Sequence, residues 1–148
     1  ILSVDIDGND YWIWKEINVV NPVMVIAEYN AVFGPANKWT IPYKADFQGV
    51  SEHASRYYWG VSLNALCHLA HEKGYSLIGC NSNGNNAYFV RNDKLGSLKT
   101  KTSQEGFIDA SFRLYSDASG EKWGGSKSIS LLKGMQIFDI DKGGLVTI

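Results

Sequence analysis

Short blocks of apolar residues separated by polar turns run through the first ninety residues and predict alternating strands and helices. Ile1–Val4 is an apolar run that leads into acidic residues, as a buried parallel strand feeding a loop does. Ile13, Trp14 and Ile17 then recur at helical spacing, and Val23–Ala27 is a second apolar run. The opening thirty residues are therefore expected to form a β-loop-α-β unit with parallel strands.

The next predicted elements are a helix and an antiparallel hairpin. Ser62–Lys73 carries one apolar stripe, with a serine suited to cap its start and a glycine, Gly74, suited to end it. Ser76–Cys80 and Ala87–Arg91 are strands joined by a turn of Asn, Ser and Gly, and so short a link favours antiparallel pairing. After Asn92 the clearest pattern is a terminal hairpin from residues 136–140 and 145–148.

A long aromatic-rich connection lies between these two parts. Phe33–Tyr58 contains no clear helix or strand pattern, and it is too long to be an idle connection in a compact domain. Its aromatic content argues against disorder. We expect a folded loop that covers the carboxyl edge of the sheet.

The composition and charge of the chain give no indication of a nucleic-acid or membrane partner. The chain has 148 residues, 45% of them hydrophobic, and a formal net charge of −1, which gives no nucleic-acid footprint and no sign of a membrane partner. Cys67 and Cys80 fit no metal-binding spacing, and two such cysteines in an α/β pattern are more often reduced. A disulfide between them stays open. The predicted location is the cytoplasm.

The acidic corner, Asp5-Ile6-Asp7-Gly8-Asn9-Asp10, is the strongest candidate for chemistry. Ligands of open parallel sheets bind beyond the carboxyl ends of the strands, and the second strand also ends in polar residues, Glu28 and Asn30. Asp and Asn before a helix can serve simply as caps and turn formers. Three acids within six residues exceed that need, because like charges repel unless they are balanced. A divalent metal, a general base or a ligand's hydroxyl or amino groups would account for them.

Other side chains are weaker candidates. His53, in the aromatic loop, is a candidate acid-base group, whereas His68 and His71 are interpreted as surface residues. Loop aromatics commonly pack on the edge of a core, but they can also cover a substrate. The residues predicted to bind substrate are Asp10, Tyr11, Glu28, Asn30, Trp39, Tyr43 and Tyr58.

The stretch from Ile1 to Asp10 resembles the fourth-strand motif of FkbM-type and related class I S-adenosylmethionine-dependent methyltransferases, in which an apolar strand ends in an acidic, glycine-containing corner. The tracts 74–81 and 86–91 are similar to the last two strands of such domains. The resemblance covers about residues 1–92. It implies an α/β fold with a partial Rossmann-like sheet, of parallel strands and a closing antiparallel pair, and a C-terminal α+β extension over 93–148.

The resemblance also implies a function and a cofactor. It predicts methyl transfer from S-adenosylmethionine to an oxygen or nitrogen of a small molecule or sugar, with Asp5 and Asp7 as catalytic residues. Asp5, Gly8 and Asn9 would contact the cofactor. Metal-dependent O-methyltransferases of this fold hold a divalent ion at these strand ends, which assigns Asp5, Asp7 and Asn30 to Mg²⁺. The family's first strands and Gly-rich loop have no counterpart, so the chain is expected to be the C-terminal half of such a domain.

Two rival interpretations remain. Asp5-Ile6-Asp7-Gly8 also resembles the first motif of phosphatases of the haloacid dehalogenase type, where the first Asp is the nucleophile, the second an acid-base, and magnesium lies alongside. Against it, Asn9 stands where Thr or Val usually follows the glycine. The third interpretation is a binding module that kept the fold without the chemistry. The oligomeric state has no signature in the sequence.

Overall fold

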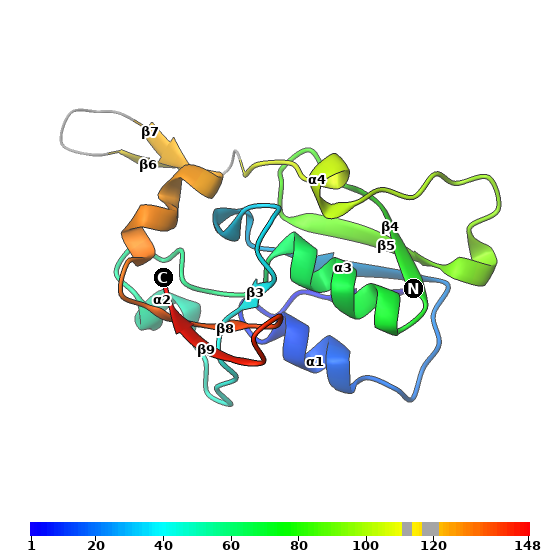
Figure 1. Ribbon diagram of the computed structural model, residues 1–148, viewed down its shortest axis with the longest axis horizontal. Coiled ribbons are helices and arrows are strands. Elements are labelled where there is room, and N and C mark those ends of the chain that lie inside the picture. Colours follow the sequence, from blue (N-terminus) through cyan, green and yellow to red (C-terminus); the bar gives the residue numbers. More distant parts are fainter. Residues whose placement is uncertain (111–113, 117–121) are drawn as a thin grey trace.

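A computed structural model of the protein describes residues 1–110, 114–116 and 122–148. The fold is mixed α/β, with one mixed sheet, a second antiparallel sheet and short helices (Figure 1). The mixed sheet has the order β1-β2-β5-β4. Its strands are β1 (Leu2–Val4), β2 (Met24–Glu28), β4 (Tyr75–Cys80) and β5 (Asn86–Arg91).

The predicted elements of the first ninety residues are confirmed. β1 and β2 pair in parallel, with Val4 opposite Ala27, and α1 (Asp10–Glu16) lies between them in the chain. β5 pairs antiparallel with both β2 and β4, so the predicted hairpin closes the sheet. The predicted helix is α3 (Leu63–Glu72), in which the hydroxyl of Ser62 accepts a hydrogen bond from the amide of Ala65 at 3.2 Å.

The two longest α-helices, α1 and α3, pack on the sheet beside each other. α1 contacts α3, and α3 contacts β4 (Figure 1). The resulting core is apolar, as the sequence pattern requires, because the inward faces of both helices meet the buried positions of β2 and β5. Its fully buried members include Trp14, Val25, Leu66, Leu69 and Phe89.

The second sheet joins the middle of the chain to its end. The predicted terminal hairpin is confirmed as β8 (Gln136–Asp139) and β9 (Gly144–Thr147). β8 also pairs antiparallel with β3 (Trp39–Thr40), a contact that the sequence pattern did not predict. The segments 1–92 and 93–148 therefore share a sheet, and a second cluster of buried side chains joins them: Val32, Phe33, Ile41, Tyr57, Tyr58, Leu132 and Ile137.

The remaining elements are short. Besides β3, the predicted aromatic loop contains one α-helical turn, and a 3-10 turn ends at its first residue, Phe33. The part of the chain after Asn92 carries a small antiparallel strand pair and a 3-10 helix in addition to the terminal hairpin. Within the described ranges, no helix has the length and apolar character needed to cross a membrane. These elements are η1 (Ala31–Phe33), α2 (Gly49–Glu52), η2 (Asn92–Lys94), α4 (Ser103–Gly106), β6 (Leu114–Ser116), β7 (Lys122–Gly124) and η3 (Gly125–Leu132).

Candidate functional site

The acidic corner is a tight turn held together by the side chain of Asp10. This carboxylate is fully buried and accepts hydrogen bonds from the amides of Ile6 and Gly8, each at 3.0 Å. Such bonds from a side chain to nearby amides fix the turn that leads from β1 into α1. Asp7 adopts a left-handed backbone conformation (φ 57°), which Asp tolerates better than most residues. Asp10 therefore shapes the corner and leaves Asp5 and Asp7 at its surface.

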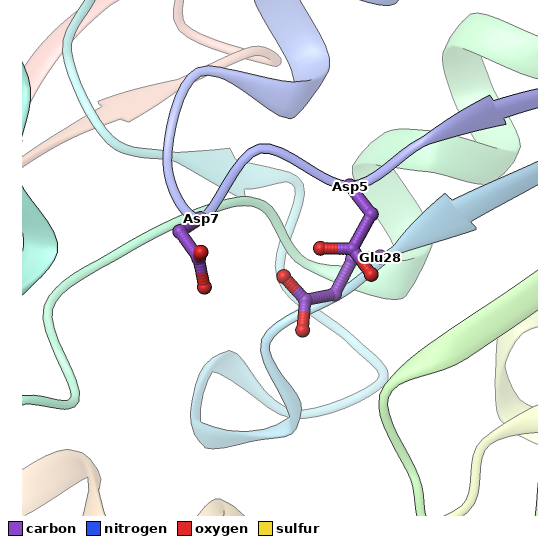
Figure 2. Close-up of side chains that lie close together, drawn as sticks. All are labelled: Asp5, Asp7 and Glu28. Carbon is purple, nitrogen blue, oxygen red and sulfur yellow. The ribbon is translucent and has the colours of Figure 1, made fainter.

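Three carboxylates converge at the end of the parallel strand pair. Asp5 and Asp7 come from the acidic corner, and Glu28 is the last residue of β2. One oxygen from each lies within 4.8 Å of the others. Figure 2 shows the carboxylate of Glu28 between those of Asp5 and Asp7. Among the residues that the structure describes, no other group of three Asp, Glu, His or Cys side chains is gathered so closely. We call these three residues the acidic cluster.

The members of the acidic cluster differ in exposure. Asp5 and Asp7 are exposed, whereas Glu28 is only 5% exposed. The pKa of Glu28 is raised to about 8, first by burial and then by the negative charges of Asp5 and Asp10, against a hydrogen bond from Asn85 that lowers it. The Oε2 atom of Glu28 is buried and has no hydrogen-bond partner within the described part of the chain.

No basic side chain balances the acidic cluster in the described residues. The ion pairs found there involve other carboxylates, such as those of Glu52, Asp93 and Asp141. Carboxylates this close raise each other's energy when ionised. The cluster is thus suited to a ligand that carries positive charge or donates hydrogen bonds.

The aromatic loop packs directly on the acidic corner. A side chain at Gly8 would overlap the ring of Phe47, and a Cβ on Gly49 would lie 3.4 Å from the carbonyl oxygen of Asp7. The side-chain nitrogen of Asn9 donates a hydrogen bond to the backbone carbonyl of Lys44 at 2.8 Å. The expectation that this loop covers the carboxyl edge of the sheet is met at this corner. Gly8 and Asn9, predicted to bind cofactor, contact the loop.

Asn30 stabilises the same loop from the other strand. Its side-chain nitrogen donates to the carbonyls of Tyr57 and Trp59, both at 2.8 Å, and its oxygen accepts from the amide of Val32 at 3.0 Å. Asn30 is buried. Its polar atoms are therefore used by the fold, and the third carboxylate of the acidic cluster comes from Glu28, which was predicted to bind substrate.

The other predicted side chains have mainly local partners. Tyr11 is 4% exposed and belongs to the main core, and the hydroxyl of Tyr58 donates to the carbonyl of Gln136 at 2.5 Å. The indole of Trp39 donates to Asp139 at 3.3 Å, and Tyr43 is 60% exposed. The Nδ1 atom of His53 lies 2.8 Å from the hydroxyl of Ser55. The functional assignments of these residues stay predictions.

The sequence pattern did not single out three residues near the site: Phe47, Gly49 and Asn85. Phe47 and Gly49 pack on the acidic corner, and Asn85 forms a hydrogen bond with Glu28. Phe47 and Gly49 sit within the predicted aromatic loop, so the loop's composition is the only signal that pointed toward them. Asn85 was interpreted as a turn residue. Its carbonyl accepts from the amide of Tyr29 at 2.7 Å, which brings it beside Glu28.

Comparison of the chain with protein-family models, curated proteins and solved structures found no match. The interpretation of the site therefore depends on its own geometry and chemistry.

Proposed function

We propose that the chain is part of an S-adenosylmethionine-dependent methyltransferase, in which the acidic cluster forms the acceptor side of the active site. The observation that carries this proposal is the convergence of Asp5, Asp7 and Glu28 beyond adjacent parallel strands. In open sheets of this kind, ligands bind beyond the carboxyl ends of the strands. The sequence resemblance adds the reaction, and the acidic cluster offers the groups that would orient an acceptor.

The arrangement of the sheet supports the same proposal. The resemblance implies parallel strands followed by a closing antiparallel pair, and the order β1-β2-β5-β4 contains both. β5 lies between β2 and β4 and runs antiparallel to each. This order places the hairpin on the far side of β2 from β1, and Asp5 and Asp7, beyond the end of β1, are exposed.

The residues of this chain fit the acceptor better than the bulk of the cofactor. Gly8 has no side chain and packs against Phe47. The side-chain nitrogen of Asn9 donates a hydrogen bond to Lys44, so it is not free to bind a ligand. Asp5 and Asp7 are exposed carboxylates with no hydrogen bond to another described side chain. Asp5 is thus the one predicted cofactor residue whose side chain can face both the methyl group and the acceptor.

The proposed mechanism is positioning and proton removal. S-adenosylmethionine supplies the methyl group when it is bound. The carboxylate of Asp7 accepts a hydrogen bond from the O–H or N–H of the acceptor, aligns the nucleophile for in-line attack and takes its proton. The exposed ring of Tyr43, in the loop that packs on the corner, offers an apolar face for a sugar or a flat ring.

The test is calorimetric titration of S-adenosylmethionine into the full-length natural protein, followed by transfer of a radiolabelled methyl group to phenol, amine and sugar acceptors. We expect binding, and transfer that Asp7→Asn lowers by about a hundredfold or more, as loss of a general base does. Asp46→Asn, an exposed acid on the same loop as Tyr43, is the matched control and should leave transfer unchanged. Absence of cofactor binding, with and without magnesium, would contradict the proposal.

The phosphatase interpretation gives a different outcome in the same samples. Asp5 and Asp7 lie together, as that interpretation also requires. Magnesium-dependent hydrolysis of p-nitrophenyl phosphate, lost in Asp5→Asn and not accompanied by binding of S-adenosylmethionine, would replace methyl transfer with phosphoryl transfer. Neither activity in the presence of intact cation binding would favour a binding module.

A further inference from the structure

The spacing of the acidic cluster matches the first coordination shell of a hard divalent cation. Ligand oxygens of Ca²⁺ lie at about 2.4 Å from the ion, so two of them are at most about 4.8 Å apart; for Mg²⁺, at about 2.1 Å, the limit is about 4.2 Å. One oxygen each from Asp5, Asp7 and Glu28 lies within 4.8 Å of the others. The three carboxylates are therefore close enough for a single ion to contact all of them after the side chains move toward it.

A second observation points to a ligand at the same place. The Oε2 atom of Glu28 is buried and lacks a hydrogen-bond partner among the described residues. The residue as a whole is only 5% exposed, so bulk water does not satisfy this oxygen either. An unpaired polar oxygen in that position costs free energy unless something outside the protein satisfies it. Figure 2 shows that the carboxylate is directed toward Asp5 and Asp7, and not toward the sheet.

We propose that Asp5, Asp7 and Glu28 bind one divalent cation of the Mg²⁺, Mn²⁺ and Ca²⁺ class. Three carboxylates are hard oxygen ligands, which these ions prefer, and the set contains no thiolate or imidazole that would favour zinc. Their combined negative charge is met by the ion, and Oε2 of Glu28 gains a partner. Coordination positions not used by the three carboxylates remain for water or an oxygen of a second ligand.

Asn30 is not required for this site. Its oxygen already accepts a hydrogen bond from Val32, and its nitrogen is used by two carbonyls of the aromatic loop. Asp10 is also excluded as a ligand, because its two oxygens accept from the amides of Ile6 and Gly8. Asp10 acts as a positioning residue that holds the corner in the shape that brings Asp5 and Asp7 toward Glu28.

The test is calorimetric titration of Mg²⁺, Mn²⁺ and Ca²⁺, each alone, into the intact protein after removal of metals with a chelator. We expect one ion per chain. Glu28→Gln and Asp7→Asn should each weaken binding by at least about tenfold, because each removes one charged ligand. Asp7 is exposed, so Asp7→Asn keeps the fold even if the buried Glu28→Gln does not. Asp46→Asn, outside the cluster, should bind the ion as the natural protein does.

No binding of any of the three ions at millimolar concentration would overturn the proposal. Equal affinity in the natural protein, Asp7→Asn and Glu28→Gln would also overturn it, because the ion would then lie elsewhere. This inference does not depend on methyl transfer. Cation binding without binding of S-adenosylmethionine would contradict the proposed function alone, and the reverse result would contradict the cation site alone.

Discussion

Asp5 and Glu28 stand one residue beyond the last registered pair of β1 and β2, which is Val4 opposite Ala27. The two carboxylates therefore leave the sheet at neighbouring points of two parallel strands. The turn fixed by Asp10 then brings Asp7 back to the same place. This adjacency makes the acidic cluster a property of the strand register, and its consequences can be measured residue by residue.

The buried carboxyl of Glu28 should make the protein less stable as the pH rises when no cation is present. The pKa of Glu28 is about 8 in the fold and near its ordinary value of 4.5 when the chain is unfolded. The folded state thus holds a proton between these values that the unfolded state has lost, and stability decreases from about pH 4.5 to about pH 8. Glu28→Gln removes this loss and should be more stable than the natural protein at pH 9 by about a few kcal/mol.

Thermal unfolding in EDTA at pH 5, 7 and 9 measures this effect. The difference in melting temperature between Glu28→Gln and the natural protein should grow with pH. Glu16→Gln, an exposed change of the same kind on α1, should follow the natural protein at each pH. If the melting temperatures of all three proteins change with pH in the same way, ionisation of Glu28 does not destabilise the fold, which would contradict this prediction.

Gly8→Ala should destabilise the fold by about 1–3 kcal/mol, the usual cost of overpacking. The added Cβ would overlap the ring of Phe47, which has to move off the corner. Gly144→Ala is the matched control, because a Cβ there meets no atom within 4 Å. Urea denaturation gives both values, and the pair Gly8→Ala with Phe47→Ala should lose less stability than the sum of the single changes.

Asn30→Ala should lower the free energy of unfolding by about 2–4 kcal/mol. The change leaves the carbonyls of Tyr57 and Trp59 and the amide of Val32 without the bonds they now make to this side chain. Asn64→Ala removes one exposed hydrogen bond, to the carbonyl of Ala36, and should cost less than about 1 kcal/mol. If urea denaturation gives the two variants equal stability, Asn30 does not hold the aromatic loop.

The two cysteines should react slowly in the folded protein. Both are free thiols, and burial raises the pKa of Cys67 to about 12 and that of Cys80 to about 11. The thiolate is the reactive form, so its small fraction at pH 7.5 limits alkylation. Iodoacetamide labelling followed by mass spectrometry should be at least about tenfold slower in buffer than in urea. Equal rates in both conditions would contradict this.

The parts of the fold near the site were predictable because their signals are local. β1, β2 and the hairpin of β4 and β5 are short apolar blocks bounded by turn residues, and the helix after Ser62 has both a cap and a stripe. The acidic corner was predictable for the same reason. Its residues lie within six positions of one another, at the end of a recognisable strand.

The rest depended on contacts that no local pattern encodes. β3 has only two residues, and it exists because β8, about a hundred positions later, pairs with it. The close packing of Phe47 against Gly8, where an added Cβ would overlap the ring, also joins distant segments. Glu28 and Asn30 are two positions apart at the end of β2, and the sequence does not tell which of them joins the acidic cluster. In the structure Glu28 joins it, whereas Asn30 is hydrogen-bonded to Tyr57 and Val32.

The most direct measurement of the central claim is an anomalous difference map from crystals soaked in Mn²⁺. The acidic cluster as a cation site predicts a peak between the carboxylates of Asp5, Asp7 and Glu28, absent in crystals of Asp7→Asn soaked in the same way. A map without a peak at that position, from crystals in which the three side chains are ordered, would contradict the claim.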